Sequence, residues 1–165
     1  MKETAFFKKI FLFQELEDGE IKQVLSRAAS KEFPAGAVII QEGEAGDSMF
    51  IMCEGEVEIT KQLTLILGED IPRERVMTRL RAGDGVSFGE MALLENEVRS
   101  ATVTALTDCR LLELHRDEFL GVVRQYPPMG NKLLLRLAHL LSRHLRKTNQ
   151  DVVKLTTALA ISLGA

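Results

Sequence analysis

The sequence lacks the features that mark membrane-spanning and exported chains. Its 165 residues contain no apolar run of the roughly 18–20 residues that a transmembrane helix needs. The N-terminus has no signal-peptide pattern, because Lys8 and Lys9 directly follow Phe6 and Phe7 and interrupt any apolar stretch. We therefore expect a cytoplasmic protein without a membrane contact, with one domain and an appended helix.

Cysteine, histidine and positive charge are also scarce. Cys53 and Cys109 lie in apolar, strand-like runs, which favours buried free thiols over a disulfide. Of three histidines only His115 lies near the predicted strands, so we expect no metal site of the several-histidine kind found in cupin β-rolls. The net charge of −3 gives no basic surplus for nucleic-acid binding. No Walker loop and no serine or cysteine with a matching histidine and acid is present, so we expect no enzyme.

Helical periodicity is present in the first 29 residues. Apolar residues recur there at helical spacing, at Ile10, Phe13 and Leu16, and then at Ile21, Val24, Leu25 and Ala28. Asp18 is the expected N-cap of the second helical piece.

Between residues 30 and 115 the pattern changes to short strands separated by glycine-containing turns. The predicted strands are Ala37–Gln41, Met49–Cys53, Val57–Leu67, Glu74–Leu80, Thr102–Leu106 and Arg110–Leu114. A protruding tip is expected around Glu69–Arg75. Many short strands at this spacing predict a mainly β fold, a double-stranded β-helix or jelly-roll-like β-roll, with N-terminal helices and a long C-terminal helix.

A second helical zone follows the strands. Arg116–Arg124 is a short amphipathic piece that ends at Tyr126-Pro127-Pro128. Neither glycine nor proline occurs from Asn131 to Leu163, which allows one helix of about 33 residues. We place the domain boundary here, with the β-roll and its N-terminal helices in residues 1–130 and the long helix in residues 131–165.

The long helix carries two apolar faces. Leu133, Leu137 and Leu140 form a face for packing on the helix's own domain. The second face follows a heptad pattern, with Asn131, Ala138, Leu145, Val152 and Leu159 at a and Leu134, Leu141, Thr148, Leu155 and Ser162 at d. Seven of these ten positions are apolar. Two apolar faces predict packing on the domain and pairing with a second copy, hence a homodimer.

The segment Phe88–Ala101 carries the chemistry. Gly89 permits close backbone approach, and the free N–H groups of a helical turn at Glu90–Leu94 would form a small anion site. Arg99 stands in an apolar setting where its charge needs an anion, and its planar fork suits two phosphate oxygens. Glu90, an acceptor only, suits a sugar hydroxyl. Glycine, turn, acid and arginine at this spacing predict a ribose-phosphate site.

This segment resembles a known motif. Phe-Gly-Glu-Met-Ala-Leu at 88–93, followed by Arg-Ser-Ala-Thr-Val at 99–103, is similar to the phosphate-binding cassette of cyclic nucleotide-binding domains, such as those of the catabolite activator protein and the protein kinase A regulatory subunit. Residues 33–36, 40–50 and 55–57 resemble the first β-roll turns of the family, so the likeness covers roughly residues 5–150. It implies a cyclic nucleotide-binding sensor whose ligand is cyclic AMP, with cyclic GMP as the alternative.

The resemblance also implies roles for individual residues. Glu90 would hold the ribose 2′-hydroxyl, and Arg99 the exocyclic phosphate oxygens. Backbone N–H groups around three further residues of the turn would help bind the phosphate: Gly89, Met91 and Ala92. Ser100 would add a hydroxyl to the phosphate or the base.

The end of the long helix adds the expected contacts to the base. Aligning residues 144–149 with the long helix of the catabolite activator protein puts Thr148 and Asn149 at adenine-contacting positions. Thr148 falls on a d position, so the resemblance and the heptad together place it where it reaches a partner's ligand. This coincidence favours cyclic AMP over cyclic GMP.

Several positions depart from the family pattern. Asn96-Glu97-Val98 stands where relatives often have Gly-Thr-Pro, and Glu95 and Glu97 put negative charge close to an anionic ligand. The alternative function is therefore a ligand-free β-roll that serves as a dimerisation or protein-interaction module. Only sixteen residues follow Asn149, so we expect no direct DNA binding, and the downstream protein partner is not encoded in any motif.

Overall fold

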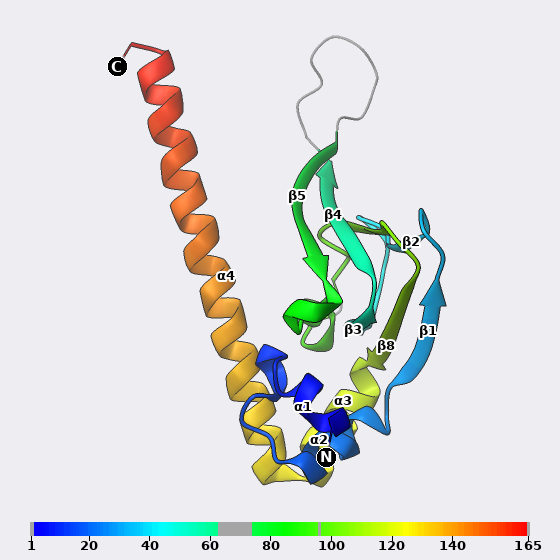
Figure 1. Cartoon of the computed structure of the whole chain (residues 1–165). Coiled ribbons are helices and arrows are strands. Elements are labelled where there is room, and N and C mark those ends of the chain that lie inside the picture. Colours follow the sequence, from blue (N-terminus) through cyan, green and yellow to red (C-terminus); the bar gives the residue numbers. More distant parts are fainter. Residues whose placement is uncertain (1, 63–73, 96, 165) are drawn as a thin grey trace.

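The protein is built from two four-stranded antiparallel sheets with helices gathered at one end (Figure 1). The structure, a computed structural model, describes residues 2–62, 74–95 and 97–164. One sheet has the strand order β1-β8-β3-β6 and the other β2-β7-β4-β5. This arrangement, with its N-terminal helices and long C-terminal helix, confirms the predicted β-roll.

The strands follow the glycine punctuation of the sequence, with two additions. Their bounds are β1 (Ala29–Phe33), β2 (Val38–Ile40), β3 (Ser48–Glu54), β4 (Glu56–Gln62), β5 (Glu74–Arg81), β6 (Ser87–Phe88), β7 (Thr102–Ala105) and β8 (Cys109–His115). Strand β1, which is polar and almost wholly exposed, and the two-residue β6 were not predicted from the sequence. Strand β1 has no apolar alternation of its own and forms because β8 pairs with it. The far end of the strand predicted at 57–67 and most of the tip expected at 69–75 lie outside the described residues.

The helices are α1 (Lys2–Phe7), α2 (Asp18–Leu25), α3 (Arg116–Gln125) and α4 (Pro127–Ser162), with 3-10 turns η1 (Phe11–Phe13), η2 (Ala82–Asp84) and η3 (Glu90–Leu93). The expected N-cap at Asp18 is wrong. Glu17 caps α2, and its backbone N–H donates to Glu20 Oε2 at 2.8 Å in a capping box. The long helix begins at Pro127 rather than Asn131, because prolines fit the first turn, where the missing N–H has no partner inside the helix.

Two clusters of buried side chains hold these elements together. One lies between the sheets and includes Val57, Leu111 and Phe50, whose ring stacks on that of Phe88 at 5.6 Å between centroids. The other joins the helices to the end of the roll and includes Phe13, Ile21, Phe119, Leu133 and Leu137. Because Phe88 is anchored in the first cluster, the chain segment that follows it starts from a fixed point.

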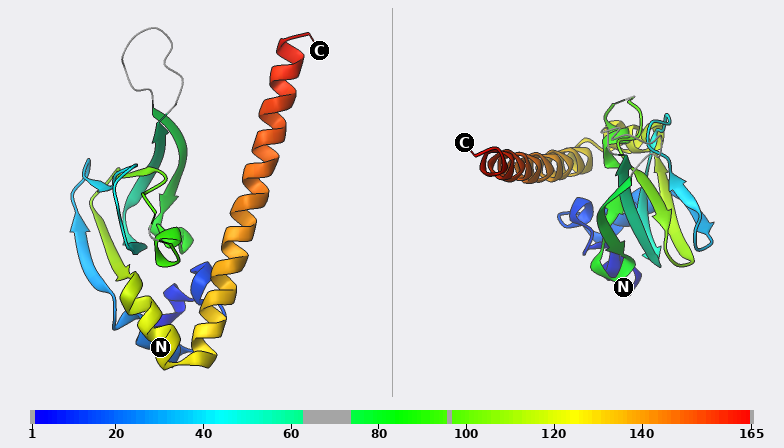
Figure 2. Two further views of the ribbon diagram at one scale, coloured as in Figure 1. Left: turned by 180° about the vertical axis from the view of Figure 1, so that it is seen from behind. Right: turned by 90° about the horizontal axis from the view of Figure 1, so that it is seen from above.

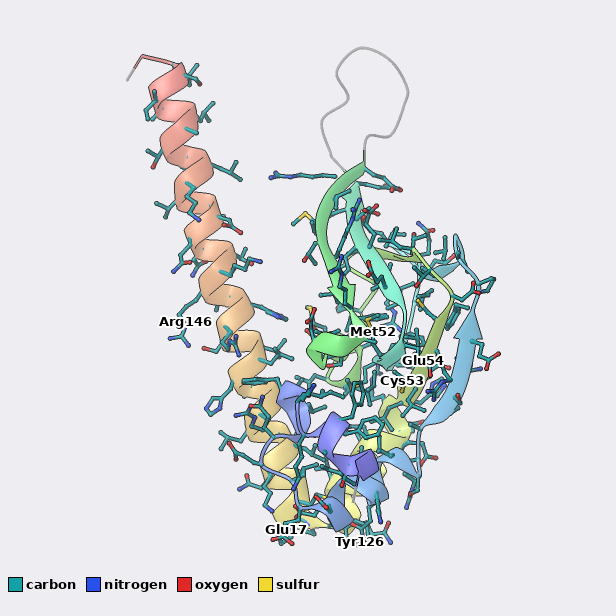
Figure 3. All side chains as sticks on the ribbon, in the orientation of Figure 1. Glu17, Met52, Cys53, Glu54, Tyr126 and Arg146 are labelled. Carbon is teal, nitrogen blue, oxygen red and sulfur yellow. The ribbon has the colours of Figure 1, made fainter. Side chains whose placement is uncertain are left out.

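Helix α4 turns back at Tyr126, at the helical end of the molecule, and then runs beside the roll (Figures 1 and 3). Seen from above, it projects away from the sheets, and the side chain of Arg146 points outward (Figures 2 and 3). Its first half is fixed by Arg136, whose Nε donates to the Phe11 carbonyl at 2.9 Å and whose guanidinium lies 3.7 Å from the centre of the Phe11 ring. No helix in the described ranges is long and apolar enough to cross a membrane.

Candidate functional site

The predicted anion-binding turn begins at a glycine that no other residue replaces without strain. Gly89 has φ +78°, a left-handed conformation, and directly follows the anchored Phe88. A Cβ at this position would lie 3.0 Å from Arg99 Nη1 and 3.2 Å from the Ser48 carbonyl oxygen. The 3-10 turn η3 starts at the next residue, and the first N–H groups of such a turn have no carbonyl partner inside it.

Arg99 lies across a second glycine. A Cβ on Gly46 would come within 2.2 Å of Arg99 Nε, so only glycine leaves room for the guanidinium. Arg99 Nη2 donates to Ser48 Oγ at 3.2 Å, and Ser48 Oγ donates to Glu113 Oε1 at 2.8 Å. Burial lowers the pKa of Arg99 below its ordinary value, while the negative charges of Asp47 and Glu113 oppose this effect. The guanidinium still remains charged at neutral pH.

One nitrogen of the Arg99 guanidinium, Nη1, lacks a hydrogen-bond partner among the described residues. Arg99 Nη1 is inaccessible to solvent and has no hydrogen-bond acceptor among the residues that the structure describes. A buried charged donor without an acceptor is costly, so it points to an anion that completes the site. The sequence analysis predicted an anionic partner for this arginine, and the geometry leaves one donor in place for it.

Backbone pairing holds the segment before Arg99 in register. The Arg99 N–H donates to the Glu44 carbonyl at 2.8 Å, and the Gly43 N–H donates to the Arg99 carbonyl at 2.9 Å. An isolated bridge between Ala45 and Val98 continues this pairing. The guanidinium is therefore positioned by the main chain on one side and by Ser48 on the other.

Arg116, which the sequence analysis did not single out, fixes the other end of the turn. Its Nε donates to the Ala92 carbonyl at 2.7 Å, and its Nη2 donates to the Glu95 carbonyl at 2.8 Å. The Arg116 N–H donates to the Asp47 carbonyl at 2.7 Å. The first residue of α3 thus links the turn, the β2–β3 loop and the helices, a contact that no local pattern predicts.

Glu90 is the buried acid of the site. Its side chain is 10% exposed, and its Oε1 lies 3.3 Å from His144 Nδ1 of α4. His144 is exposed on α4, and its contact with the buried acid was not predicted from the sequence. No local pattern of the sequence indicates this contact, because 54 positions separate the two residues and the path of α4 brings them together.

Two cavities meet at these residues. The smaller, of about 110 Å³, is lined by Gly89, Glu90, Met91, Ala92, Glu95, Glu97, Val98, Arg99 and Ser100. The second, of about 300 Å³, shares Gly89, Glu90, Arg99 and Ser100, and adds the apolar residues Ile40, Ile59, Leu80 and Val103 as well as His144. A charged pocket next to a mostly apolar one suits a molecule with an anionic end and a flat, weakly polar end.

Two larger hollows lie elsewhere, one of about 580 Å³ between the N-terminal helices and the strands and one of about 590 Å³ on the roll. Both are lined in part by Arg110, which is hydrogen-bonded to Glu54. The charge of Arg110 is therefore already balanced by Glu54, whereas Arg99 Nη1 has no acceptor among the described residues. Volume favours these hollows, but chemistry favours the cavities beside Arg99.

The structure brings together six of the eight predicted site residues: Gly89, Glu90, Met91, Ala92, Arg99 and Ser100 all line the smaller cavity. The Ala92 N–H donates to the Gly89 carbonyl at 3.2 Å within the turn, so this group is engaged. Thr148 and Asn149 lie on an exposed stretch of α4 and line neither cavity of their own chain. Their role as base contacts stays a prediction that needs a second chain.

The thiols and candidate metal ligands lie outside this site. Cys53 and Cys109 are free, and Cys109 is buried as expected, whereas Cys53 is only half-buried. In residues 2–62, 74–95 and 97–164 no group of three or more histidine, cysteine, aspartate or glutamate side chains is arranged to hold a metal ion.

Comparison with known proteins connects this geometry to a family. The profile described as cyclic nucleotide-binding domain matches residues 30–126. The cyclic AMP receptor protein of Thermus thermophilus is 32% identical over 141 residues, which are 86% of this chain and 60% of the relative. The crystal structure of the Thermus thermophilus catabolite activator protein superposes with a TM-score of 0.77 at 31% identity, over 88% of this chain and 63% of that one.

A third relative is the regulatory domain of Toxoplasma gondii protein kinase A with cyclic AMP. It has a TM-score of 0.60 at 36% identity, over 72% of this chain and 42% of that one. The chain thus spans less than two thirds of the length of each of these relatives. The profile covers more than half of the chain, and the protein belongs to the cyclic nucleotide-binding domain family.

Proposed function

We propose that this domain is a sensor that binds cyclic AMP in the two joined cavities beside Arg99 and catalyses no reaction. The observation that carries the proposal is the buried Arg99 Nη1, which has no acceptor among the described residues. An exocyclic phosphate oxygen of a cyclic nucleotide supplies that acceptor, and a charge-assisted hydrogen bond of this kind is among the strongest in proteins.

The remaining parts of the ligand fit the remaining parts of the site. The N–H groups at the start of η3 have no carbonyl partner inside the turn, and in this proposal they donate to the same phosphate as Arg99. Glu90 accepts a hydrogen bond from the ribose 2′-hydroxyl. The purine occupies the cavity of about 300 Å³, whose walls include Ile40, Ile59 and Val103.

Cyclic AMP is preferred over cyclic GMP in this proposal for two reasons. A relative that covers most of the chain is named a cyclic AMP receptor protein, and the Toxoplasma structure contains cyclic AMP. Thr148 and Asn149 are exposed on α4 and free to meet an adenine in a second copy of the chain. Cyclic GMP is the alternative ligand.

The signal in this proposal leaves the site through α4. Ligand draws η3 and Arg99 together, and Arg116 transmits that movement to the corner at Tyr126, where α4 begins. In this proposal the boundary between the β-roll domain, residues 1–130, and the helical region, residues 131–165, lies in the first turn of that helix. Two copies pair through the exposed apolar face of α4, whose leucines include Leu145, Leu155 and Leu159.

The thiols and the arginines of α4 bear on the cellular compartment and on the partners of the protein. The two free thiols suit the reducing cytoplasm. We assign no DNA contact to α4, because Arg136 and Arg143 are engaged with the ring of Phe11. The downstream partner is a protein that reads the position of α4.

A second candidate function is a ligand-free dimerisation or protein-interaction module. Its support is the acidic lining of the smaller cavity, since Glu90, Glu95 and Glu97 all border the position of the phosphate. Carboxylates beside a phosphate weaken its binding by charge repulsion.

Calorimetric titration with cyclic AMP and with cyclic GMP separates the two functions. The sensor binds cyclic AMP with a dissociation constant well below about 1 mM, and the ligand-free module binds neither nucleotide at that concentration. Arg99→Ala is expected to lose about 2–5 kcal/mol of binding, the usual cost of truncating one partner of a buried charge pair.

Arg110→Ala is the matched control, because Arg110 is an arginine of the same roll that pairs with Glu54 away from the site. It is expected to bind cyclic AMP as the wild type does. Equal affinity of the Arg99→Ala variant and the wild type would show that the phosphate lies elsewhere.

A further inference from the structure

The contact between His144 and Glu90 joins the long helix to the nucleotide site across 54 positions of sequence. His144 Nδ1 lies 3.3 Å from Glu90 Oε1, and His144 also lines the cavity of about 300 Å³ beside Arg99. The carboxylate is 10% exposed, whereas the imidazole is 56% exposed. The acid therefore depends on its partner more than the histidine does.

An ionised carboxylate that is buried needs a hydrogen-bond donor or an opposite charge. Among the interactions of the described residues, His144 is the partner of the Glu90 carboxylate. It occupies Oε1, which leaves Oε2 available for a ribose hydroxyl. The two contacts can therefore exist together, and His144 holds the acid in place without blocking it.

Charged groups lie near His144 on η3, on α4 itself and on the segment that carries Arg99. The hydrogen bond to Glu90 of η3 raises the pKa of His144 above its ordinary value, while burial and the positive charges of Lys147 and Arg143 on α4 act against it. Arg99 lines the same cavity, and β5 contributes the uncharged side chains of Thr78 and Leu80.

We propose that His144 is a positioning residue for Glu90 and that nucleotide binding and protonation of His144 favour each other. The inference rests on the proposed function, because it uses a cyclic nucleotide at Arg99. The phosphate brings a negative charge into a cavity that already holds the carboxylate of Glu90. Protonated His144 neutralises that carboxylate, so the complex takes up a proton from solvent onto the imidazole.

This coupling gives α4 a direct connection to the ligand. Binding strengthens the ion pair between His144 and Glu90, and by reciprocity a helix held in the paired position strengthens binding. The sign for pH follows from the same linkage. Because the complex holds more protons than the free protein, affinity for cyclic AMP rises as pH falls through the titration range of His144.

Calorimetry of cyclic AMP binding between pH 8.5 and 6.0, in buffers of different ionisation enthalpy, tests the coupling. For the wild type we expect about a threefold to tenfold gain in affinity over this range, equivalent to a pKa rise of about half a unit to one unit, with net proton uptake. His144→Gln keeps a hydrogen-bond donor for Glu90 but cannot titrate, so its affinity is expected to be independent of pH. His139→Gln, an exposed histidine on the same helix, is expected to behave as the wild type.

Three results overturn the proposal. An equal pH slope in the wild type and in His144→Gln would assign the titration to a group other than His144. Proton release on binding would reverse the sign and show that ligand displaces His144 from Glu90. A purely structural role of His144 would lower affinity in His144→Gln equally at every pH, and so also contradicts the coupling.

A measurement without ligand separates this proposal from the proposed function. In the free protein, the NMR titration of the His144 ring is expected to move to lower pH in Glu90→Gln, because the negative charge is lost. If that shift is found and the wild type binds no cyclic nucleotide at any pH, the contact stands, but the sensor function and the coupling to ligand both fall. If the shift is absent while cyclic AMP binds, the sensor stands and the role of His144 falls.

Discussion

The two halves of α4 carry similar apolar residues in opposite environments. In the first half Met129, Leu133 and Leu137 are at most 3% exposed, whereas in the second half Leu155 and Leu159 are 60% and 58% exposed. Helical periodicity is continuous across both halves, so the sequence pattern does not cause the difference. An apolar helix face is buried only where another surface packs against it, and the domain provides such a surface for the first half of α4 only.

The largest effect is expected where the first half is buried. Leu137→Ala removes a fully buried side chain from the helical cluster and is expected to lower the free energy of unfolding by about 2–5 kcal/mol. Leu159→Ala on the exposed half is the matched control, with an expected change below about 0.5 kcal/mol in the monomer. Urea unfolding at low protein concentration measures both. Similar losses in the two variants would contradict the contrast between the halves.

The apolar face of the exposed half is expected to pack against a second copy of the chain. Leu155→Lys combined with Leu159→Lys puts two charges on the heptad face and is expected to weaken the dimer by about a hundredfold, which is roughly 2.8 kcal/mol. Light scattering across a range of concentrations measures the mass. Lys154→Glu, away from the a and d positions, is the control and should leave the mass unchanged. A monomeric wild type would remove the explanation for the exposed leucines.

The close packing of α3 and α4 gives a test of the buried half with a smaller expected change in unfolding free energy. A Cβ on Gly130 would lie 2.7 Å from the Val123 carbonyl oxygen and 2.8 Å from Val123 Cα, so Gly130→Ala must push the two helices apart. The expected loss in unfolding free energy is about 1–2 kcal/mol. A Cβ on Gly121 in α3 would make only an ordinary contact, 3.9 Å from Arg27 Nη1, so Gly121→Ala is expected to gain about 0.5–1 kcal/mol through helix propensity. Opposite signs in one unfolding experiment would confirm the close approach.

The sequence predicted those parts of the fold and the site that depend on residues close together in the chain. Glycine punctuation gave six strands, and the spacing of Gly89, Glu90 and Arg99 gave the residues that gather around the smaller cavity. Strand β1 was missed because its stability comes from β8, which is far away in the sequence. The contact of His144 with Glu90 was missed because it depends on the direction in which α4 leaves Tyr126.

The smallest expected effect concerns the charges that fix the first half of α4. Lys132 Nζ lies 2.8 Å from Glu20 Oε2, whereas the pair in the second half, Lys154 and Asp151, is separated by 3.8 Å and exposed. Burial raises the pKa of Glu20, but the hydrogen bonds from Lys132 and from the Glu17 backbone outweigh it, so the pKa lies below its ordinary value of 4.5.

A lowered pKa in the folded state means that Glu20 stabilises the fold above pH 4.5 and that this contribution is lost as pH falls through the folded value. Glu20→Gln keeps the capping box but carries no charge, so it mimics the protonated acid. We expect it to be slightly less stable than the wild type at pH 7 and equally stable near pH 3, as measured by urea unfolding. Asp151→Asn should change stability at neither pH, because exposed pairs contribute little. A difference between wild type and Glu20→Gln that stays constant with pH would show that packing, not charge, holds this half of α4.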